Sequence, residues 1–130
     1  MSTTFPTYTG NADGNIITSA SLAASTSTTG DYDAQGVYEV QVHVLNTPGG
    51  TVSATRGVRI DVYRKYGNGP TVGESPFMTF TLPSATISTA ESIDFFLPTG
   101  IYQIKLTNLD AAQAVTVEVT GDTVDNLTTI

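Results

Sequence analysis

The sequence predicts an all-β protein, an antiparallel β-sandwich of seven or eight strands. Every strongly patterned segment alternates apolar and polar residues with a period of two, which is typical of strands buried on one face. No segment shows the 3.6-residue period of an amphipathic helix of ordinary length. Clusters of Pro, Gly, Asn and Asp separate the alternating segments, as turns separate the short strands of a sandwich.

The first strong strand is expected at residues 37–44. It places Tyr38 and three valines on one face, and Glu39, Gln41 and His43 on the other. A turn rich in Pro and Gly follows, and the alternation resumes over residues 58–63. We therefore expect these two strands to pair as an antiparallel hairpin.

Three apolar stretches in the second half of the chain predict further strands. Residues 77–82 lie between two prolines, and residues 92–97 direct Ile, Phe and Leu to one face. The strand that begins at residue 101 and the valine-rich strand at 115–120 are separated by a short polar connection at 109–113. These last two strands are expected to form a second hairpin.

The N-terminal third is less strongly patterned. Residues 15–27, rich in Ile, Thr, Ser and Ala, favour an edge strand, with a helical turn around Ala20–Ala24 as the alternative. Gly30–Asp33 is expected to lead into the first hairpin. We predict a flexible N-terminal arm at residues 1–14, a sandwich domain at 15–122 and a C-terminal tail at 123–130.

A Pro/Gly corner precedes the strand that begins at residue 101. Leu97, Gly100 and Tyr102 stand in the run Leu-Pro-Thr-Gly-Ile-Tyr, and Tyr102 falls on the same face as Ile104 and the following Leu. The run resembles the tyrosine corner of immunoglobulin-like β-sandwiches, in which a tyrosine hydroxyl donates a hydrogen bond to backbone upstream. The resemblance implies an immunoglobulin-like or jelly-roll Greek-key arrangement.

Composition limits the partners and the compartment. The chain has 130 residues, no cysteine and a net charge of -7, which suits one domain without disulfides and disfavours nucleic acid or an anionic membrane as a partner. The N-terminus has no positive region followed by an apolar run, so we expect no signal peptide, and no segment is long and apolar enough for a membrane span. These features predict synthesis in a cytoplasm.

No catalytic or cofactor constellation is apparent, and the sequence predicts a protein that is not an enzyme and holds no cofactor. His43 is the only histidine and has no serine or cysteine motif near it, and one histidine without cysteine does not make a zinc site. Calcium is the stronger metal candidate, because Asn11–Asn15 and Asp31–Asp33 supply clustered oxygen ligands. Ordinary turn chemistry explains the same residues and is preferred.

Most of the basic residues gather in one short segment. Arg and Tyr are enriched at binding hot spots, so this cluster is a candidate contact surface; the alternative is an edge strand protected by charge against aggregation. Several aromatic residues are expected in loops or on outer faces, where they suit stacking on sugar rings. The candidate contact residues are Phe5, Tyr8, Arg56, Arg59, Tyr63, Arg64, Lys65 and Tyr66, and Tyr32 is a further expected outer-face aromatic.

Three segments carry a wider resemblance: residues 36–44, 58–66 and 97–102. Together with the acidic, cysteine-free, Ser/Thr-rich composition, they resemble small virion proteins of tailed bacteriophages, most of all β-sandwich capsid decoration (cement) proteins. This implies a homo-oligomer, often a trimer, on the capsid surface, which binds the major capsid protein and stabilises contacts between neighbouring subunits by mass action. A glycan-binding or adhesion module of a head or tail appendage is the alternative, and an enzyme is the least favoured class.

Overall fold

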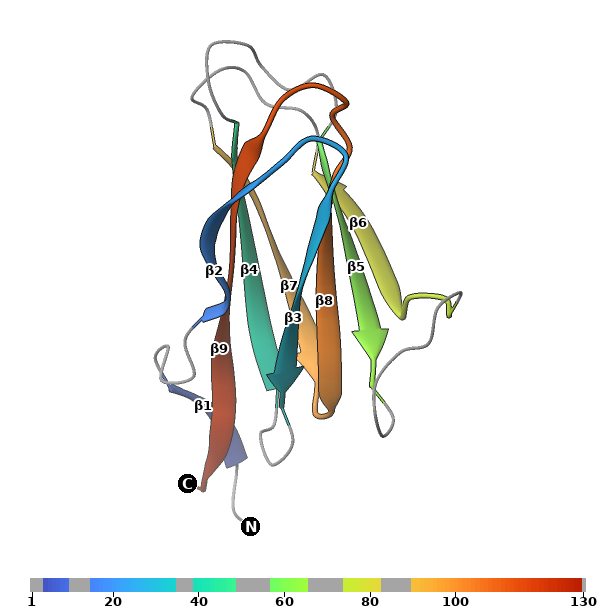
Figure 1. Ribbon diagram of the computed structural model, residues 1–130. Coiled ribbons are helices and arrows are strands. Elements are labelled where there is room, and N and C mark those ends of the chain that lie inside the picture. The colour runs from blue at the N-terminus through green and yellow to red at the C-terminus, as the bar shows by residue number, and fades with distance from the viewer. Residues whose placement is uncertain are drawn as a thin grey trace.

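The computed structural model describes residues 4–9, 15–34, 39–48, 57–65, 74–82 and 90–129, with side chains in 15–34, 39–47, 57–65, 74–82 and 90–122 (Figure 1). Over these residues the chain forms an antiparallel β-sandwich, which confirms the predicted fold class. One sheet has five strands, in the order β1-β9-β4-β7 with β2 also paired to β9, and the other has four, in the order β3-β8-β5-β6. The strands are β1 (Thr4–Thr9), β2 (Asn15–Leu22), β3 (Ser27–Asp33), β4 (Glu39–Pro48), β5 (Val58–Arg64), β6 (Met78–Leu82), β7 (Glu91–Pro98), β8 (Ile101–Asn108) and β9 (Val115–Thr129).

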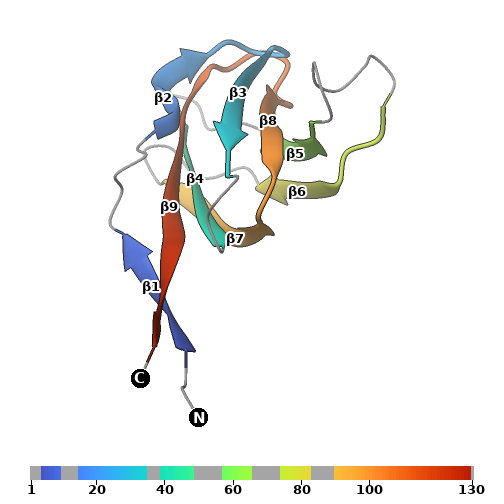
Figure 2. The ribbon, with the colours of Figure 1, turned by 90° about the horizontal axis from the view of Figure 1, so that it is seen from below.

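The two sheets pack face to face around one apolar core. Figure 2 shows β9, β4 and β7 in one layer and β3, β8 and β5 in the other. The faces that the alternation predicts as apolar point inward: Val40, Val42 and Val44 of β4 are fully buried, as are Ile104 and Leu106 of β8. The period-two pattern therefore identifies the buried face of the strongly alternating strands correctly.

The predicted hairpin between the first two strong strands is wrong. β4 lies between β7 and β9 in the five-stranded sheet, whereas β5 lies between β6 and β8 in the opposite sheet. β4 and β5 thus belong to different layers. Alternation states which face is buried, but an inward apolar face fits either sheet equally well, so it does not select the partner strand.

The second predicted hairpin is also wrong, because β8 and β9 belong to different sheets. The connection between them is held by two buried polar side chains. Asn108 donates from Nδ2 to the carbonyls of Leu22 (3.2 Å) and Gln113 (2.8 Å), and its Oδ1 accepts the N–H of Asp110 at 3.0 Å. The Asp110 carboxylate accepts the N–H groups of Ala112 and Gln113, both at 2.7 Å. These hydrogen bonds satisfy backbone N–H and C=O groups in and beside a turn that lies outside the β-ladders.

Residues 15–33 form two strands, β2 and β3, joined by a short turn. β2 confirms the preference for a strand over a helical turn, and the chain reverses where Thr26 donates its N–H to the carbonyl of Ala23 at 3.3 Å. β3 then pairs with β8 along its whole length, where the sequence predicts only a lead-in. Tyr32 is consequently not on an outer face: it stands opposite the buried Tyr102 and is itself buried.

The first and last described strands, β1 and β9, pair in one ladder. β1 pairs with the end of β9, from Thr4 opposite Thr129 to Thr9 opposite Thr123. This two-stranded extension projects past the rest of the sandwich in both ribbon views (Figures 1 and 2). β9 thus continues beyond Asp122, the residue at which the sequence analysis ends the sandwich domain.

The predicted tyrosine corner is present between β7 and β8. The Tyr102 hydroxyl donates to the carbonyl of Pro98 at 2.6 Å, and the ring is fully buried. Gly100 adopts φ +152°, and a Cβ there would lie 3.3 Å from the Tyr102 hydroxyl oxygen. Gly100 also accepts the N–H of Ala34 at 2.7 Å, so the corner is tied to the end of β3. The strand pair that the corner connects lies in opposite sheets, as in the fold that the corner resembles.

Replacing Tyr102 with phenylalanine is expected to lower the free energy of unfolding by about 1 to 2 kcal/mol, because it removes the hydroxyl of a buried ring and its hydrogen bond to the Pro98 carbonyl. The measurement is chemical denaturation. Tyr63→Phe, at an outward-facing tyrosine, is the matched control and should leave the midpoint unchanged. Equal midpoints for Tyr102→Phe and the unaltered protein would show that the corner bond contributes nothing.

Candidate functional site

The outer face of the four-stranded sheet brings an aromatic ring and several polar side chains together. Tyr63 of β5 stands opposite Gln103 of β8, and Gln103 stands opposite Asp31 of β3, so these three residues form one row across three strands. Alternation sends all three side chains away from the core, since the residues beside them, such as Val62 and Ile104, are fully buried. We call this row the Tyr63 row.

Hydrogen bonds fix the polar members of the Tyr63 row. Lys65, just after β5, donates from Nζ to Oδ2 of Asp31 at 3.0 Å, and Gln103 donates from Nε2 to Oδ1 of the same carboxylate at 3.4 Å. The backbone N–H of Lys65 also donates to the carbonyl of Ile101 at 2.9 Å, which holds the end of β5 against β8. The row therefore presents an aromatic ring beside oriented amide and carboxylate groups.

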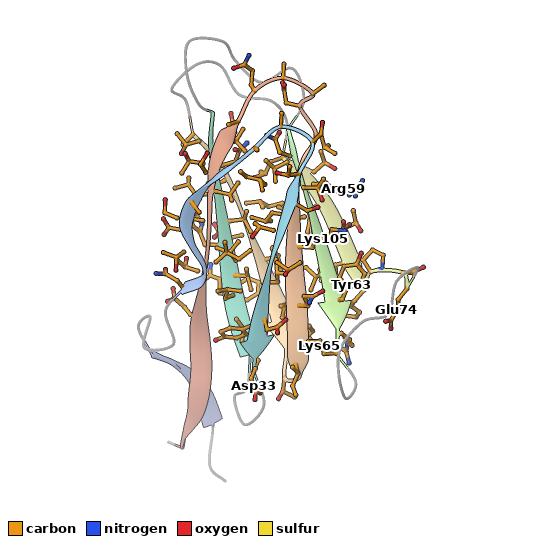
Figure 3. The ribbon with its side chains drawn as sticks, viewed as in Figure 1. Asp33, Arg59, Tyr63, Lys65, Glu74 and Lys105 are labelled. Atoms are coloured by element: carbon orange, nitrogen blue, oxygen red, sulfur yellow. The ribbon has the colours of Figure 1, made fainter. Side chains whose placement is uncertain are left out.

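A second ion pair lies further along the same face. Arg59 donates from Nε to Oδ2 of Asp61 at 3.0 Å, and the Thr79 hydroxyl donates to Oδ1 at 3.0 Å. Asp61 belongs to the outward side of β5, as its alternation predicts, but its side chain is only 6% exposed because these neighbours cover it. Figure 3 shows Arg59, Tyr63 and Lys65 along β5 with Lys105 on the neighbouring strand.

The Arg64 side chain lies on the opposite side of β5 from the side chains of Tyr63 and Lys65. Its guanidinium carbon lies 4.5 Å from the centroid of the Phe77 ring and 5.9 Å from that of Tyr102. Phe77, just before β6, is 45% exposed, so the cation rests on a ring at the molecular surface. The structure thus separates the predicted contact residues Arg64 and Tyr63, while it keeps Tyr63, Lys65 and Arg59 on one face.

The remaining predicted contact residues are not placed in the site. Arg56 and Tyr66 lie outside the described residues, and Phe5 and Tyr8 belong to β1, where the description does not extend to side chains. Their roles stay predictions. Sequence reasoning missed Asp31, Gln103 and Phe77 as members of the site, and only the pairing of β3, β5 and β8 brings the first two to Tyr63.

The outer face of the five-stranded sheet has a different character. None of its strands carries a Lys or Arg. His43 of β4 lies here, with Nδ1 2.6 Å from Oδ1 of Asp94 on β7, and both side chains are exposed. Phe96, also on β7, is 50% exposed. This face supplies a control surface for experiments on the Tyr63 row.

The calcium alternative of the sequence analysis concerns two segments. Residues 11–14 are outside the described part of the chain, and Asp31 to Asp33 form part of strand β3 instead of a loop. The Asp31 carboxylate already accepts bonds from Lys65 and Gln103. In the described side chains no three His, Cys, Asp or Glu residues are grouped as a metal site would need.

Among the described residues no helix is long and apolar enough to cross a membrane.

The fold and this site define the class of the molecule: a single antiparallel β-sandwich with a polar, aromatic-bearing outer sheet face. No protein-family model matches the sequence, and no curated protein matches it either.

Solved structures match the fold. The enzymatically active domain of tailspike protein 4 of bacteriophage CBA120 is 14% identical with a TM-score of 0.54, over 95% of this chain and 19% of the tailspike chain. A family 35 carbohydrate-binding module from an environmental isolate is 16% identical with a TM-score of 0.47, over 98% of this chain and 89% of the module. The structure of infectious bursal disease virus, Gx strain, is 10% identical with a TM-score of 0.45, over 100% of this chain and 32% of that chain. The chain thus spans about a fifth of the tailspike chain, and at this identity the likeness establishes the fold alone.

Proposed function

We propose that this protein is a glycan-binding module of the adhesion type, carried by a head or tail appendage of a phage virion. The observation that carries the proposal is the Tyr63 row, in which an outward-facing aromatic ring lies beside the hydrogen-bonded Gln103 and Asp31. This reading replaces capsid decoration as the favoured function of the sequence analysis.

The chemistry of the row suits a sugar. The face of an aromatic ring is apolar and packs against the C–H groups of a sugar ring, while amide and carboxylate groups at its edge exchange hydrogen bonds with hydroxyls. Since Lys65 and Gln103 already orient Asp31, little side-chain freedom is lost on binding. A flat sheet face also accepts an extended chain without a deep pocket.

The fold shared with a phage tailspike domain supports the virion context. The tailspike domain is an enzymatically active one, but we propose binding without catalysis for this chain. Of the carboxylates on the outer face of the four-stranded sheet, Asp31 and Asp61 are each engaged by a cation and a second donor. Such partners occupy the oxygens that a general acid or base would use.

The capsid-decoration reading stays a prediction of the sequence. It names a major capsid protein as partner, homo-oligomers on the capsid surface, and no nucleic acid or membrane. Its contact residues include Arg59, Tyr63 and Lys65, which the structure gathers on the face that we propose for glycan. Pull-down of capsids by the purified protein, unaffected by Tyr63→Ala, would favour a capsid contact elsewhere on the chain.

The proposal is tested by binding to an array of bacterial surface glycans. We expect saturable binding of at least one oligosaccharide, and a loss of about tenfold or more in affinity for Tyr63→Ala, because the ring supplies the main contact area. Phe96→Ala is the matched control: it removes a half-exposed aromatic ring from the opposite sheet and should leave the affinity unchanged.

Two outcomes would count against the proposal. One is the absence of binding to every glycan by a folded protein, and the other is binding that Tyr63→Ala leaves intact. Thermal unfolding of both variants establishes that they are folded, which is expected because both side chains point outward.

A further inference from the structure

Arg64 differs from the basic residues Arg59 and Lys65 because no carboxylate of the described side chains pairs with it. Arg59 and Lys65 each pair with an aspartate at 3.0 Å. Among the described side chains no acid pairs with Arg64, and of the twelve acids of the chain only Asp13 and Asp125 have side chains outside that description. The segments next to the site in sequence, residues 35–38 and 66–73, contain no Asp or Glu.

The hydrogen-bonding capacity of Arg64 is also unused within the described part of the chain. Its Nε atom is buried and has no acceptor there, and no other hydrogen bond of its guanidinium group is found among these residues. Buried polar atoms without partners are rare in folded proteins, and each calls for an explanation such as a functional role. The side chain as a whole is half-buried, so the end of the guanidinium group reaches the surface beside Phe77.

The aromatic rings fix Arg64 in this position. Phe77 covers one face of the guanidinium group at 4.5 Å, and Tyr102, held by its bond to Pro98, lies 5.9 Å away. Stacking on a ring uses the face of the group and leaves its edge for hydrogen bonds. A carboxylate is a partner that the edge of a guanidinium group binds well, through two parallel charge-assisted hydrogen bonds.

We propose that Arg64 and Phe77 form a subsite for the acidic group of an acidic glycan. This inference rests on the proposed glycan binding at the Tyr63 row and names the class of saccharide. Tyr63 and Arg64 are consecutive, with Cα atoms about 3.8 Å apart, and they lie on the two sides of the end of β5. A ligand longer than one sugar unit that stacks on Tyr63 and passes the end of β5 brings a carboxylate to Arg64.

Because the whole chain is acidic, a preference for an acidic glycan has to come from a particular cation. A net charge of -7 repels an acidic glycan in general, so nonspecific attraction does not account for its binding. Among the described residues, the cations that can make such a contact belong to the four-stranded sheet or follow β5 directly. Of these, Arg59 and Lys65 are paired with aspartates, and Lys105 lies on β8, opposite Asp61 and Thr29 in the sheet, without an aromatic ring of the described residues stacked on it.

The test compares uronic-acid oligosaccharides, oligogalacturonate and oligomannuronate, with their fully methyl-esterified forms. Esterification removes the charge and keeps the sugar rings, so the ratio of the two affinities isolates the acidic group. We expect the protein to bind at least one acidic form about tenfold more tightly than its ester. Arg64→Gln should erase this ratio while binding of the ester persists, and Arg64→Lys should reduce it, since an ammonium group lacks the two-point geometry.

Lys105→Gln is the matched control, because it removes the same charge from the neighbouring strand of the same sheet and should preserve the ratio. An affinity ratio near one in the unaltered protein, or a ratio that survives Arg64→Gln, overturns the inference. In either case, binding of the esters that depends on Tyr63 leaves the proposed function standing. An equal decrease of the affinity ratio in Arg64→Gln and Lys105→Gln would assign the preference to overall charge, and this would overturn the inference as well. Failure of every acidic form to bind also overturns it, and failure of all glycans overturns the proposed function too.

Discussion

Replacing Asn108 with alanine is expected to lower the free energy of unfolding by about 3 kcal/mol or more and the thermal midpoint by about 10 °C. Asn108 is fully buried and makes three hydrogen bonds, to the carbonyls of Leu22 and Gln113 and from the N–H of Asp110. The substitution removes all three of these hydrogen bonds from the interior of the protein, and it opens a small cavity. Differential scanning calorimetry measures the change.

Asn46 provides a matched control for this prediction. It is buried to the same degree on β4, but neither atom of its side-chain amide has a hydrogen-bond partner among the described residues. Asn46→Leu, which keeps the number and branching of the side-chain heavy atoms and removes the unpaired polar atoms, should leave the stability unchanged or raise it. If Asn108→Ala is as stable as the unaltered protein, the hydrogen bonds of Asn108 do not hold the β8–β9 crossing.

Replacing Gly30 with alanine is expected to be the most disruptive single-methyl change in the described strands, at about 3 kcal/mol. A Cβ at Gly30 would lie 2.4 Å from the backbone oxygen of Ile16 and 2.7 Å from Cγ1 of Ile17. The first of these atoms is backbone of β2, which cannot move aside without shifting the strand. The close approach of β3 to β2 on this side of the sandwich therefore requires glycine.

Gly121 of β9 separates this backbone clash from the general effect of an added methyl group. A Cβ there would meet Cδ1 of Ile16 at 3.2 Å and the Tyr32 ring at 3.5 Å, and Cδ1 is the flexible end of a side chain. Gly121→Ala should thus cost about 1 kcal/mol or less, measured by urea denaturation beside Gly30→Ala. Equal midpoints for the two variants would contradict the close packing of β2 on β3.

The buried face of the strongly alternating strands was predictable from the sequence, because a period of two in Val, Ile and Leu has one physical solution in a half-buried strand. Val40, Val42 and Ile104 illustrate this, and the tyrosine corner was predictable because its Pro, Gly and Tyr residues are local. The partners of the strands were not predictable. β4 and β5 both present an apolar face and a turn between them, and nothing local states that they enter different sheets.

The candidate site illustrates the same limit. Tyr63, Arg64 and Lys65 are adjacent in the chain, and their composition alone marks a contact region. Asp31 joins Lys65 through a pairing of β3 with β8 that depends on the topology of the sheet, and Phe77 reaches Arg64 from the loop before β6. Polar residues such as Asn108 and Asp110 look like ordinary turn residues until the crossing that buries them is known.

The central claim is that glycan binds the sheet face that carries the Tyr63 row, and a nuclear magnetic resonance titration tests it most directly. The backbone amide signals of the isotopically labelled protein are followed while the tightest-binding oligosaccharide from the array is added. We predict that the largest shift changes occur at Asp31, Tyr63, Lys65 and Gln103, with little change on β7. Shift changes centred on Asp94 and Phe96 of the opposite sheet, or none at saturating sugar, would contradict the claim.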